Sequence, residues 1–238
     1  MPVTDSISFV RASFDDVVDQ FDTWRFPSKF HTMSIRTSPG SFEENLIGLQ
    51  PLLGEPDYLL MATVPDEWTA ILTNRAILQE QELLSHRIGL TLKKDTVDVS
   101  LIWPSPKSGI RNFTDFGAWL QYNKNAGSLP IEHRYVSVFQ SDLGLKWNRP
   151  YLVEQSLTPF PWAPAARPDA DPFEVFNPDL LVDYCHQMGI DVFNEGFYAD
   201  RAARVTDDNL LEKIKQVASN STYEAAQKYA GIDSLVLP

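Results

Sequence analysis

The chain opens with a change of hydrophobic period. Residues 6–13, "SISFVRAS", alternate apolar and polar positions, which predicts a first strand. Apolar side chains then fall on one face at helical spacing: Phe14, Val17, Val18, Phe21 and Trp24. Ser13 precedes this stripe as an N-cap, and acidic residues occupy the first turn, where the helix dipole favours them. The pattern predicts a strand followed by an amphipathic helix.

Two further segments have helical signals. In "SFEENLIGLQPLL", residues 41–53, Ser41 and Glu44 have the spacing of a capping box, and Pro51 should end the helix. In "RAILQEQELLSHRIGL", residues 75–90, apolar side chains alternate with charged and amide groups. We expect a half-buried helix there that ends near Gly89.

Strand patterns fill much of the remaining first two thirds. Residues 57–74 form two apolar runs around Pro65-Asp66-Glu67, which predicts a hairpin. Four later segments are rich in β-branched and aromatic residues and are separated by turn residues: "TVDVSLIW", "FGAWLQYN", "RYVSVFQSD" and "LKWNRPYLVEQ". A meander of antiparallel strands is the simplest interpretation.

The C-terminal third has a different pattern. Residues 157–172 contain five prolines and no periodicity, which predicts an extended segment crossing the surface. Helices are expected beyond it, one starting at Asn177 as N-cap with Pro178 in the first turn, and one within residues 206–232. The predicted fold class is therefore α+β: a mostly antiparallel sheet, built from a hairpin and a meander, packed with amphipathic helices, and a helical C-terminal third. We expect one domain overall, with an α+β part at residues 1–168 and an acidic helical part at residues 169–238.

The net charge of the chain limits the classes of partner that we expect. The formal net charge is −12 and the pI is about 4.7, so nucleic acids and anionic membranes are poor partners. Residues 169–238 hold 13 acidic and 5 basic side chains, which concentrates the acidity there. The N-terminus lacks the pattern of a secretory signal, no apolar run approaches the length of a membrane-spanning helix, and one cysteine cannot form an intramolecular disulfide. These features predict a cytoplasmic protein.

The one place that suggests reactive chemistry is "DYCHQMGID", where Cys185 adjoins His186. On a helix, Cys185 shares an apolar stripe with Leu181, Tyr184 and Met188, whereas His186 points about 100° away. A nucleophile and base pair is therefore disfavoured, and we predict a buried, unreactive thiol and a helix that ends at Gly189.

No other motif assigns a catalytic, cofactor or metal site. The histidines lack metal-ligand spacing, and the signatures of the P-loop, the dinucleotide fold and the nucleophile elbow do not occur. The most tempting carboxylates, Asp66 and Glu67 beside Trp68, are typical of a solvated turn. We therefore name no catalytic residue, no cofactor and no metal ligand.

A partner-binding surface is the site hypothesis that the sequence favours. Its residues are an aromatic pair in the proline-rich segment and the acidic residues that follow: Phe160, Trp162, Asp169, Asp171 and Glu174. Aromatic residues are enriched at protein interfaces. The alternative is that the aromatic pair pins the crossing segment to the body of the protein.

Two segments resemble a family of uncharacterised actinobacterial proteins. "YLLMATVPDEWTAILTN" is similar to that family's hairpin, with a Trp-Thr-Ala strand that ends in asparagine. "DPFEVF" and "LLVDYCHQMGIDVFNEGFYA" resemble its closing pattern of a Gly-Ile pair and a terminal Phe-Tyr. The chain departs from the family in "RAILQEQELL" and in the tail after Tyr198. The resemblance implies an α+β fold and no catalytic residue.

Three classes of function remain open. We favour a non-enzymatic intracellular protein-binding module, for instance an immunity-type inhibitor of a basic partner, because complementary charge speeds and selects association. The alternative is an enzyme or small-molecule-binding protein whose site is assembled from scattered carboxylate and histidine residues; a deep pocket would favour it. A structural or assembly role is the third class.

Overall fold

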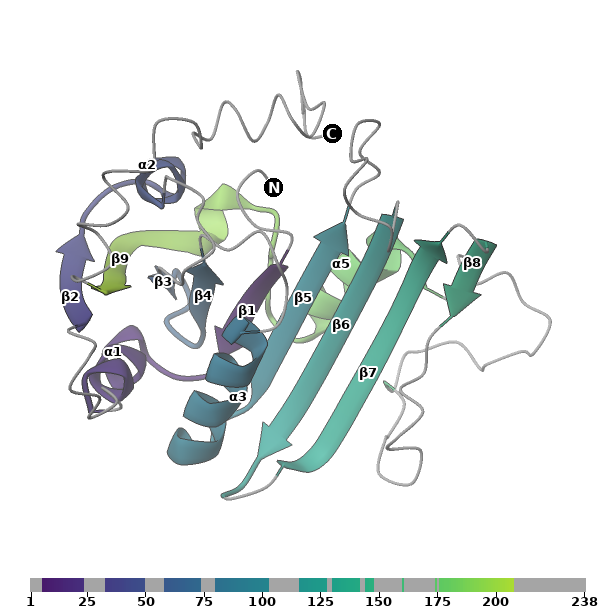
Figure 1. Ribbon diagram of the computed structural model, residues 1–238, viewed down its shortest axis with the longest axis horizontal. Coiled ribbons are helices and arrows are strands. Elements are labelled where there is room, and N and C mark those ends of the chain that lie inside the picture. Colours follow the sequence, from purple (N-terminus) through teal and green to yellow (C-terminus); the bar gives the residue numbers. More distant parts are fainter. Residues whose placement is uncertain are drawn as a thin grey trace.

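In the part of the chain that the computed structural model describes, nine strands form one continuous sheet (Figure 1). The structure describes residues 6–23, 33–49, 58–73, 80–102, 116–127, 130–141, 144–147, 160, 174 and 176–207. The strand order is β2-β9-β3-β4-β1-β5-β6-β7-β8, and all neighbouring strands are antiparallel. The strands are β1 (Ser6–Val10), β2 (Met33–Ser38), β3 (Tyr58–Thr63), β4 (Thr69–Thr73), β5 (Thr96–Ile102), β6 (Phe116–Asn125), β7 (Pro130–Ser141), β8 (Gly144–Trp147) and β9 (Tyr198–Asp207).

Local sequence signals account for most of these strands. β3 and β4 pair as the hairpin expected around Pro65-Asp66-Glu67, and Asp66 takes a left-handed φ of 50° in its turn. β5 to β8 pair in chain order as a meander. β2 was not predicted. It lies at the far edge of the sheet, beside β9.

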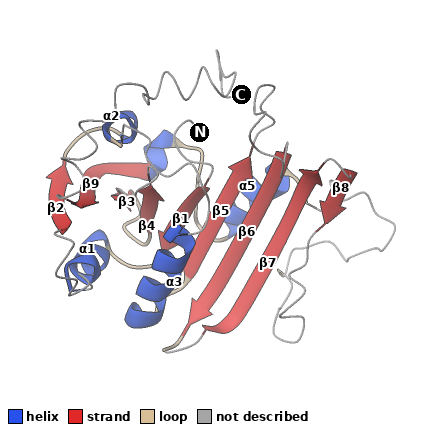
Figure 2. Ribbon diagram, in the orientation of Figure 1, coloured by secondary structure: helices blue, strands red, loops and turns tan. Residues whose placement is uncertain are grey.

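The predicted fold class is wrong in its C-terminal third. That region was expected to be helical, but residues 198–207 form β9, which lies between β2 and β3 inside the sheet (Figure 2). Ala202 and Ala203 point to opposite faces, and both are buried, so β9 lacks the alternation that marks a half-exposed strand. The described residues are mostly one antiparallel sheet with few helices. A helix was also expected within residues 206–232, but Thr206 and Asp207 end β9 instead. Residues 208–232 and the part boundary at residue 168 lie outside the described residues.

Four α-helices and one 3-10 helix pack on the described part of the sheet: α1 (Phe14–Thr23), α2 (Phe42–Gly48), α3 (Glu80–Leu92), α5 (Pro178–Gln187) and η1 (Glu195–Phe197). Three of them begin with the expected caps. At α1, the Ser13 hydroxyl oxygen accepts a hydrogen bond from the backbone N–H of Asp16. Ser41 and Glu44 form a capping box at α2, and the Asn177 side chain accepts a hydrogen bond at the start of α5. α3 continues through Gly89 for three residues, beyond the end that its glycine suggested.

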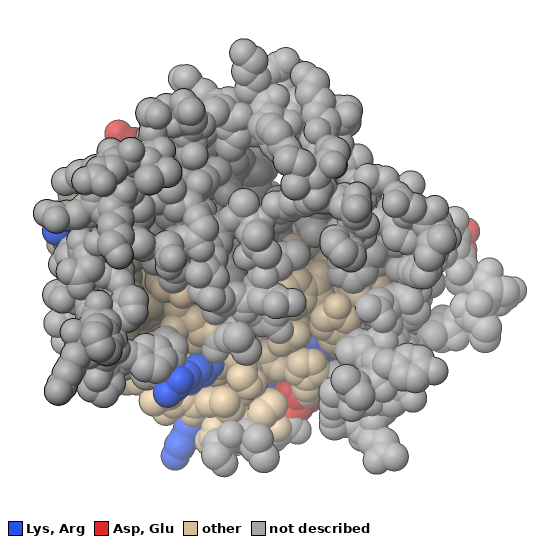
Figure 3. Space-filling model, viewed as in Figure 1, with Lys and Arg blue, Asp and Glu red and all other residues tan. Residues whose placement is uncertain are grey.

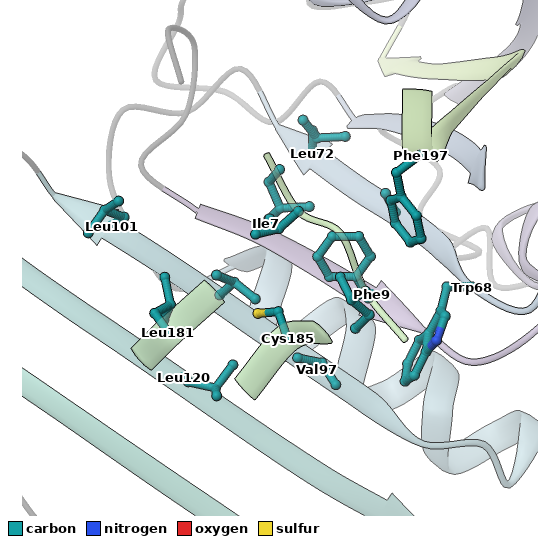
Figure 4. Packing of buried hydrophobic residues seen from close by; sticks show 14 of the residues in the cluster. Ile7, Phe9, Trp68, Leu72, Val97, Leu101, Leu120, Leu181, Cys185 and Phe197 are labelled. Carbon is teal, nitrogen blue, oxygen red and sulfur yellow. The ribbon is translucent and has the colours of Figure 1, made fainter. Parts of the chain in front are cut away.

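One face of the sheet, which we call the α5 face, carries the larger apolar core. α5 and η1 pack on it, and Leu181 and Cys185 of α5 point toward strands β1, β5 and β6 (Figure 4). The core includes Ile7, Phe9, Val97, Leu120, Leu181 and Phe176, which are fully buried. Met188 caps α5, and Gly189 follows in a left-handed conformation with φ of 78°, as the sequence predicts.

The opposite face, which we call the α3 face, is apolar at one end and polar at the other. α1 and α3 cover an apolar cluster that includes Phe14, Val17, Leu60, Ile71 and Ile88. Farther along the sheet, Ser8, Asp98 and Gln121 are register neighbours on β1, β5 and β6, and all three are buried. The Ser85 hydroxyl of α3 donates to Asp98 Oδ1 at 2.8 Å.

Candidate functional site

A pocket of about 280 Å³ opens at one end of the α5 face. It lies where α5 ends, because Gln187 and Met188 form part of its wall. The remaining lining residues come from the sheet and from one residue of the proline-rich segment: Arg11, Trp68, Asp95, Tyr122, Glu132, Arg134 and Phe160. Counted over the described residues, seven separate segments of the chain therefore meet at this pocket.

The register of the sheet explains why polar side chains gather here. Val97, Tyr122 and Arg134 are register neighbours on β5, β6 and β7. Val97 belongs to the apolar core, and the next same-face position toward the start of β5 is Asp95, just outside the strand. Glu132 lies two residues before Arg134 on β7. The pocket therefore begins where the apolar rows of the α5 face end.

Two guanidinium groups and their carboxylates form the charged part of the pocket. Arg11 lies 3.9 Å from Asp95 and 3.6 Å from Glu67 between nitrogen and oxygen atoms. Arg134 pairs directly with Glu132. The side chains of Asp95 and Arg134 are only 18% and 15% exposed. Ion pairs that are this far removed from water cost desolvation energy, so their contribution to folding alone is small.

Tyr122 lies among these charges. Its hydroxyl donates a hydrogen bond to Asp95 Oδ2 at 3.1 Å. Burial, the charge of Asp95 and this hydrogen bond, and then the charge of Glu132, raise the pKa of Tyr122 far above its ordinary value, and Arg134 opposes them. The hydroxyl therefore stays protonated at physiological pH. It acts as a hydrogen-bond donor and not as a base.

Each guanidinium lies over an aromatic ring. Arg11 Cζ is 5.8 Å from the Trp68 ring centroid, and Arg134 Cζ is 6.0 Å from that of Phe160. Both rings are buried, with exposed fractions of 2% and 4%. Phe160 also packs on Tyr184 of α5, with their centroids 5.4 Å apart. Such cation-π contacts hold the guanidiniums in place.

Of the five residues named as a partner-binding surface, the structure describes only Phe160 and Glu174. Phe160 is buried in the pocket wall, as expected for an aromatic that pins its segment to the body. Glu174 is exposed and does not line the pocket. Trp162, Asp169 and Asp171 lie outside the described residues. A partner-binding role for these five residues stays a prediction.

Sequence reasoning missed the charged residues and the tyrosine of the pocket, although it had named Phe160. Arg11, Tyr122 and Arg134 lie far apart in the chain and belong to no motif. The available signal was local: each stands at or beyond the end of an apolar alternation in a predicted strand. Asp66 and Glu67, beside Trp68, were interpreted as the carboxylates of a solvated turn. In the structure Trp68 is buried, and Glu67 pairs with Arg11 beside the pocket.

Cys185 is buried, as predicted. Its exposed fraction is 0%, it belongs to the apolar core, and burial raises its pKa. His186 lies on the outside of α5, where its Nε2 is 3.1 Å from Asp191 Oδ1. Within the described residues, no group of three or more His, Cys, Asp or Glu side chains could hold a metal ion.

Comparisons with known proteins add no relative. No protein-family model, curated protein or solved structure matches the chain. The resemblance to uncharacterised actinobacterial proteins therefore stays a prediction. No helix among the described residues is long and apolar enough to cross a membrane.

Proposed function

We propose that the protein binds a small molecule in the pocket at the end of α5. The sequence left open a related alternative, a site assembled from scattered carboxylate and histidine residues; the described pocket lining holds carboxylates and arginines and no histidine. One observation carries it: Arg11, Asp95, Tyr122, Glu132 and Arg134 converge on a single pocket from separate chain segments. Asp95, Glu132 and Arg134 are largely buried. Such charges cost free energy in the folded protein, and they cluster in pockets where a ligand uses them.

The lining chemistry favours binding over catalysis. Among the described residues that line the pocket there is no serine, cysteine or histidine to serve as nucleophile or base. Tyr122 keeps its proton, because burial and the neighbouring carboxylates raise its pKa. The proposal therefore assigns the pocket recognition by charge and hydrogen bonds, and no reaction.

A ligand screen tests the proposal. Because a ligand that binds only the folded state raises the unfolding midpoint, metabolite-sized compounds are screened by thermal denaturation of the wild type. Each hit is then titrated against Arg134→Gln and against Arg87→Gln, a matched control on an exposed residue of α3. We expect the midpoint shift to persist in the control and to fall in Arg134→Gln. A screen without hits, or hits that Arg134→Gln binds as well as the wild type does, would contradict the proposal.

The protein-binding role stays a prediction from the acidic charge. On the face drawn in Figure 3, described basic and acidic side chains lie near one another and form no acidic patch. The same holds inside the pocket, where each arginine has a carboxylate partner. A basic protein partner, a cytoplasmic location and the absence of nucleic-acid binding likewise stay predictions.

A further inference from the structure

We infer that the ligand is a small zwitterion with an apolar side group, of the α-amino-acid class. This inference rests on the proposed binding function of the pocket and names its ligand. It depends on three properties of the lining residues: the balance of their charges, the occupation of their aromatic faces and the size of the space that they enclose.

Among the described residues that line the pocket, the charges cancel. Arg11 and Arg134 supply two positive charges, and Asp95 and Glu132 supply two negative charges. A purely anionic ligand would face two carboxylates, and a purely cationic ligand would face two guanidiniums. Like charges placed together reject such ligands. A zwitterion finds an opposite charge for each of its ends.

The arrangement of the aromatic side chains in the pocket wall disfavours a ligand with a nucleobase that stacks on them. A nucleobase needs an open ring face, but a guanidinium already lies over Trp68 and another over Phe160. The two rings are almost fully buried, and Phe160 also packs on Tyr184. Because of this burial, the apolar contact surface that the described residues offer to the pocket comes from the partly buried Met188 more than from the rings. That surface suits an aliphatic or aromatic side group.

The size of the pocket limits the ligand to one small unit. Pockets for small molecules and cofactors usually enclose about 300–1,000 Å³. This pocket has about 280 Å³, which is just below that range. A dinucleotide or an extended peptide would exceed it.

The burial of the charged groups assigns the two ends of the ligand. Arg134 is more buried than Arg11, with 15% of its side chain exposed against 53%. Its planar fork suits a carboxylate bound through two hydrogen bonds, so we assign Arg134 to the ligand carboxylate. Asp95, the carboxylate nearest to the Tyr122 hydroxyl, is assigned to the ammonium group.

Calorimetric titration with matched probes tests this assignment. The probes are L-leucine, L-phenylalanine and L-methionine, with N-acetyl-L-leucine lacking the positive charge and L-leucinamide lacking the negative one. We expect at least one amino acid to bind, and its two single-charge analogues to bind at least about tenfold more weakly, because a charge-assisted bond is lost. Adenosine is the stacking control and should not bind.

Two variants separate the ends of the ligand. Arg134→Gln should weaken binding of the amino acid about tenfold or more and leave the weak binding of L-leucinamide unchanged. Asp95→Asn should weaken the amino acid and leave N-acetyl-L-leucine unchanged. Arg134→Lys keeps the charge without the fork and should fall between the wild type and Arg134→Gln, which guards against a simple folding defect. Arg87→Gln should bind as the wild type does.

The outcomes distinguish this inference from the proposed function. If the screen yields an Arg134-dependent ligand but no amino acid binds, the inference is wrong and the binding function stands. Binding of adenosine, or equal binding of L-leucine and its analogues, would also overturn the inference. If no compound binds at all, both fall.

Discussion

Polar side chains lie in different places on the two faces of the sheet. On the α5 face, the interior beneath α5 is apolar, and the charged side chains are collected in a pocket at its margin. On the α3 face, polar side chains lie in the interior itself. Thr96, Asp98 and Ser100 of β5 are at most 2% exposed. The same strand therefore contributes to two different kinds of core.

This difference indicates different roles for polar residues on the two faces. Several buried groups of the α3 face bond inside the protein, as the Ser85 hydroxyl does with Asp98. Such internal bonds specify how α3 sits on the sheet. The groups around Tyr122 border an open space instead. The α3 face therefore fixes structure, and the margin of the α5 face is where we propose that a ligand binds.

The largest expected loss comes from truncating the apolar interior of the α5 face. Leu181 is fully buried between α5 and the strands, so Leu181→Ala should reduce the free energy of unfolding by about 3 kcal/mol through lost contacts and a residual cavity. Ile47 of α2 is 48% exposed, and Ile47→Ala is the control, with an expected change within about 0.5 kcal/mol. Chemical denaturation measures both. Equal losses in the two variants would refute the assignment of Leu181 to the core.

A smaller loss should come from enlarging a residue on the α3 face. A Cβ on Gly89 would lie 2.3 Å from Thr96 Cγ2 and 2.9 Å from the backbone oxygen of Lys94. Gly89→Ala should therefore destabilise the protein by about 2 kcal/mol, although alanine normally favours a helix. Gly48 of α2 has no atom within 4 Å of its added Cβ, so Gly48→Ala should instead stabilise by about 0.5 kcal/mol.

Opposite signs for the two glycines are the critical result. Denaturant midpoints of Gly89→Ala, Gly48→Ala and the wild type measure the sign directly, since neither change alters charge. If both variants stabilised the protein, α3 would not pack on β5 as closely as the structure has it.

The sequence predicted those parts of the fold that local signals determine. The capping box of Ser41 and Glu44 and the cap at Asn177 operate within three residues, and both are found in the structure. β9 depends on neighbours more than 130 residues away. Its Ala202 and Ala203 face different clusters, so no period reveals the strand. No sequence feature near β9 indicates that this strand is buried on both faces.

The pocket was unpredictable for the same reason. Arg11 and Arg134 are brought together by the pairing of β1 with β5, of β5 with β6 and of β6 with β7. The alternation of apolar and polar residues in β5 predicts a strand with one solvent-exposed face, yet its polar face is buried. The alternation alone predicts on which face of the strand Asp98 lies, but it does not predict which element covers that face. Only the assembled sheet shows which polar residues are structural and which line a pocket.

The smallest expected effect is a difference between the two faces in their response to pH. Burial lowers the pKa of His86 and of His133 below the ordinary 6.5, and His86 lowers that of His133 further. Because the unfolded chain takes up these protons first, stability should be lost as the pH falls below about 6.5. Burial raises the pKa of Cys185 and of Tyr198 on the α5 face, so this face should lose stability only as the pH rises above about 9.

Thermal unfolding of the wild type and of His86→Gln/His133→Gln between pH 7.5 and 5.5 tests the acid arm. The unfolding midpoint of the wild type should fall across this range by less than Gly89→Ala lowers it, because both histidines are only half-buried. The double variant should show a flatter profile, since it removes both groups. Identical slopes in the two proteins would mean that burial on the α3 face does not disfavour the protonated form of either histidine. The two faces would then not differ in how their stability depends on pH.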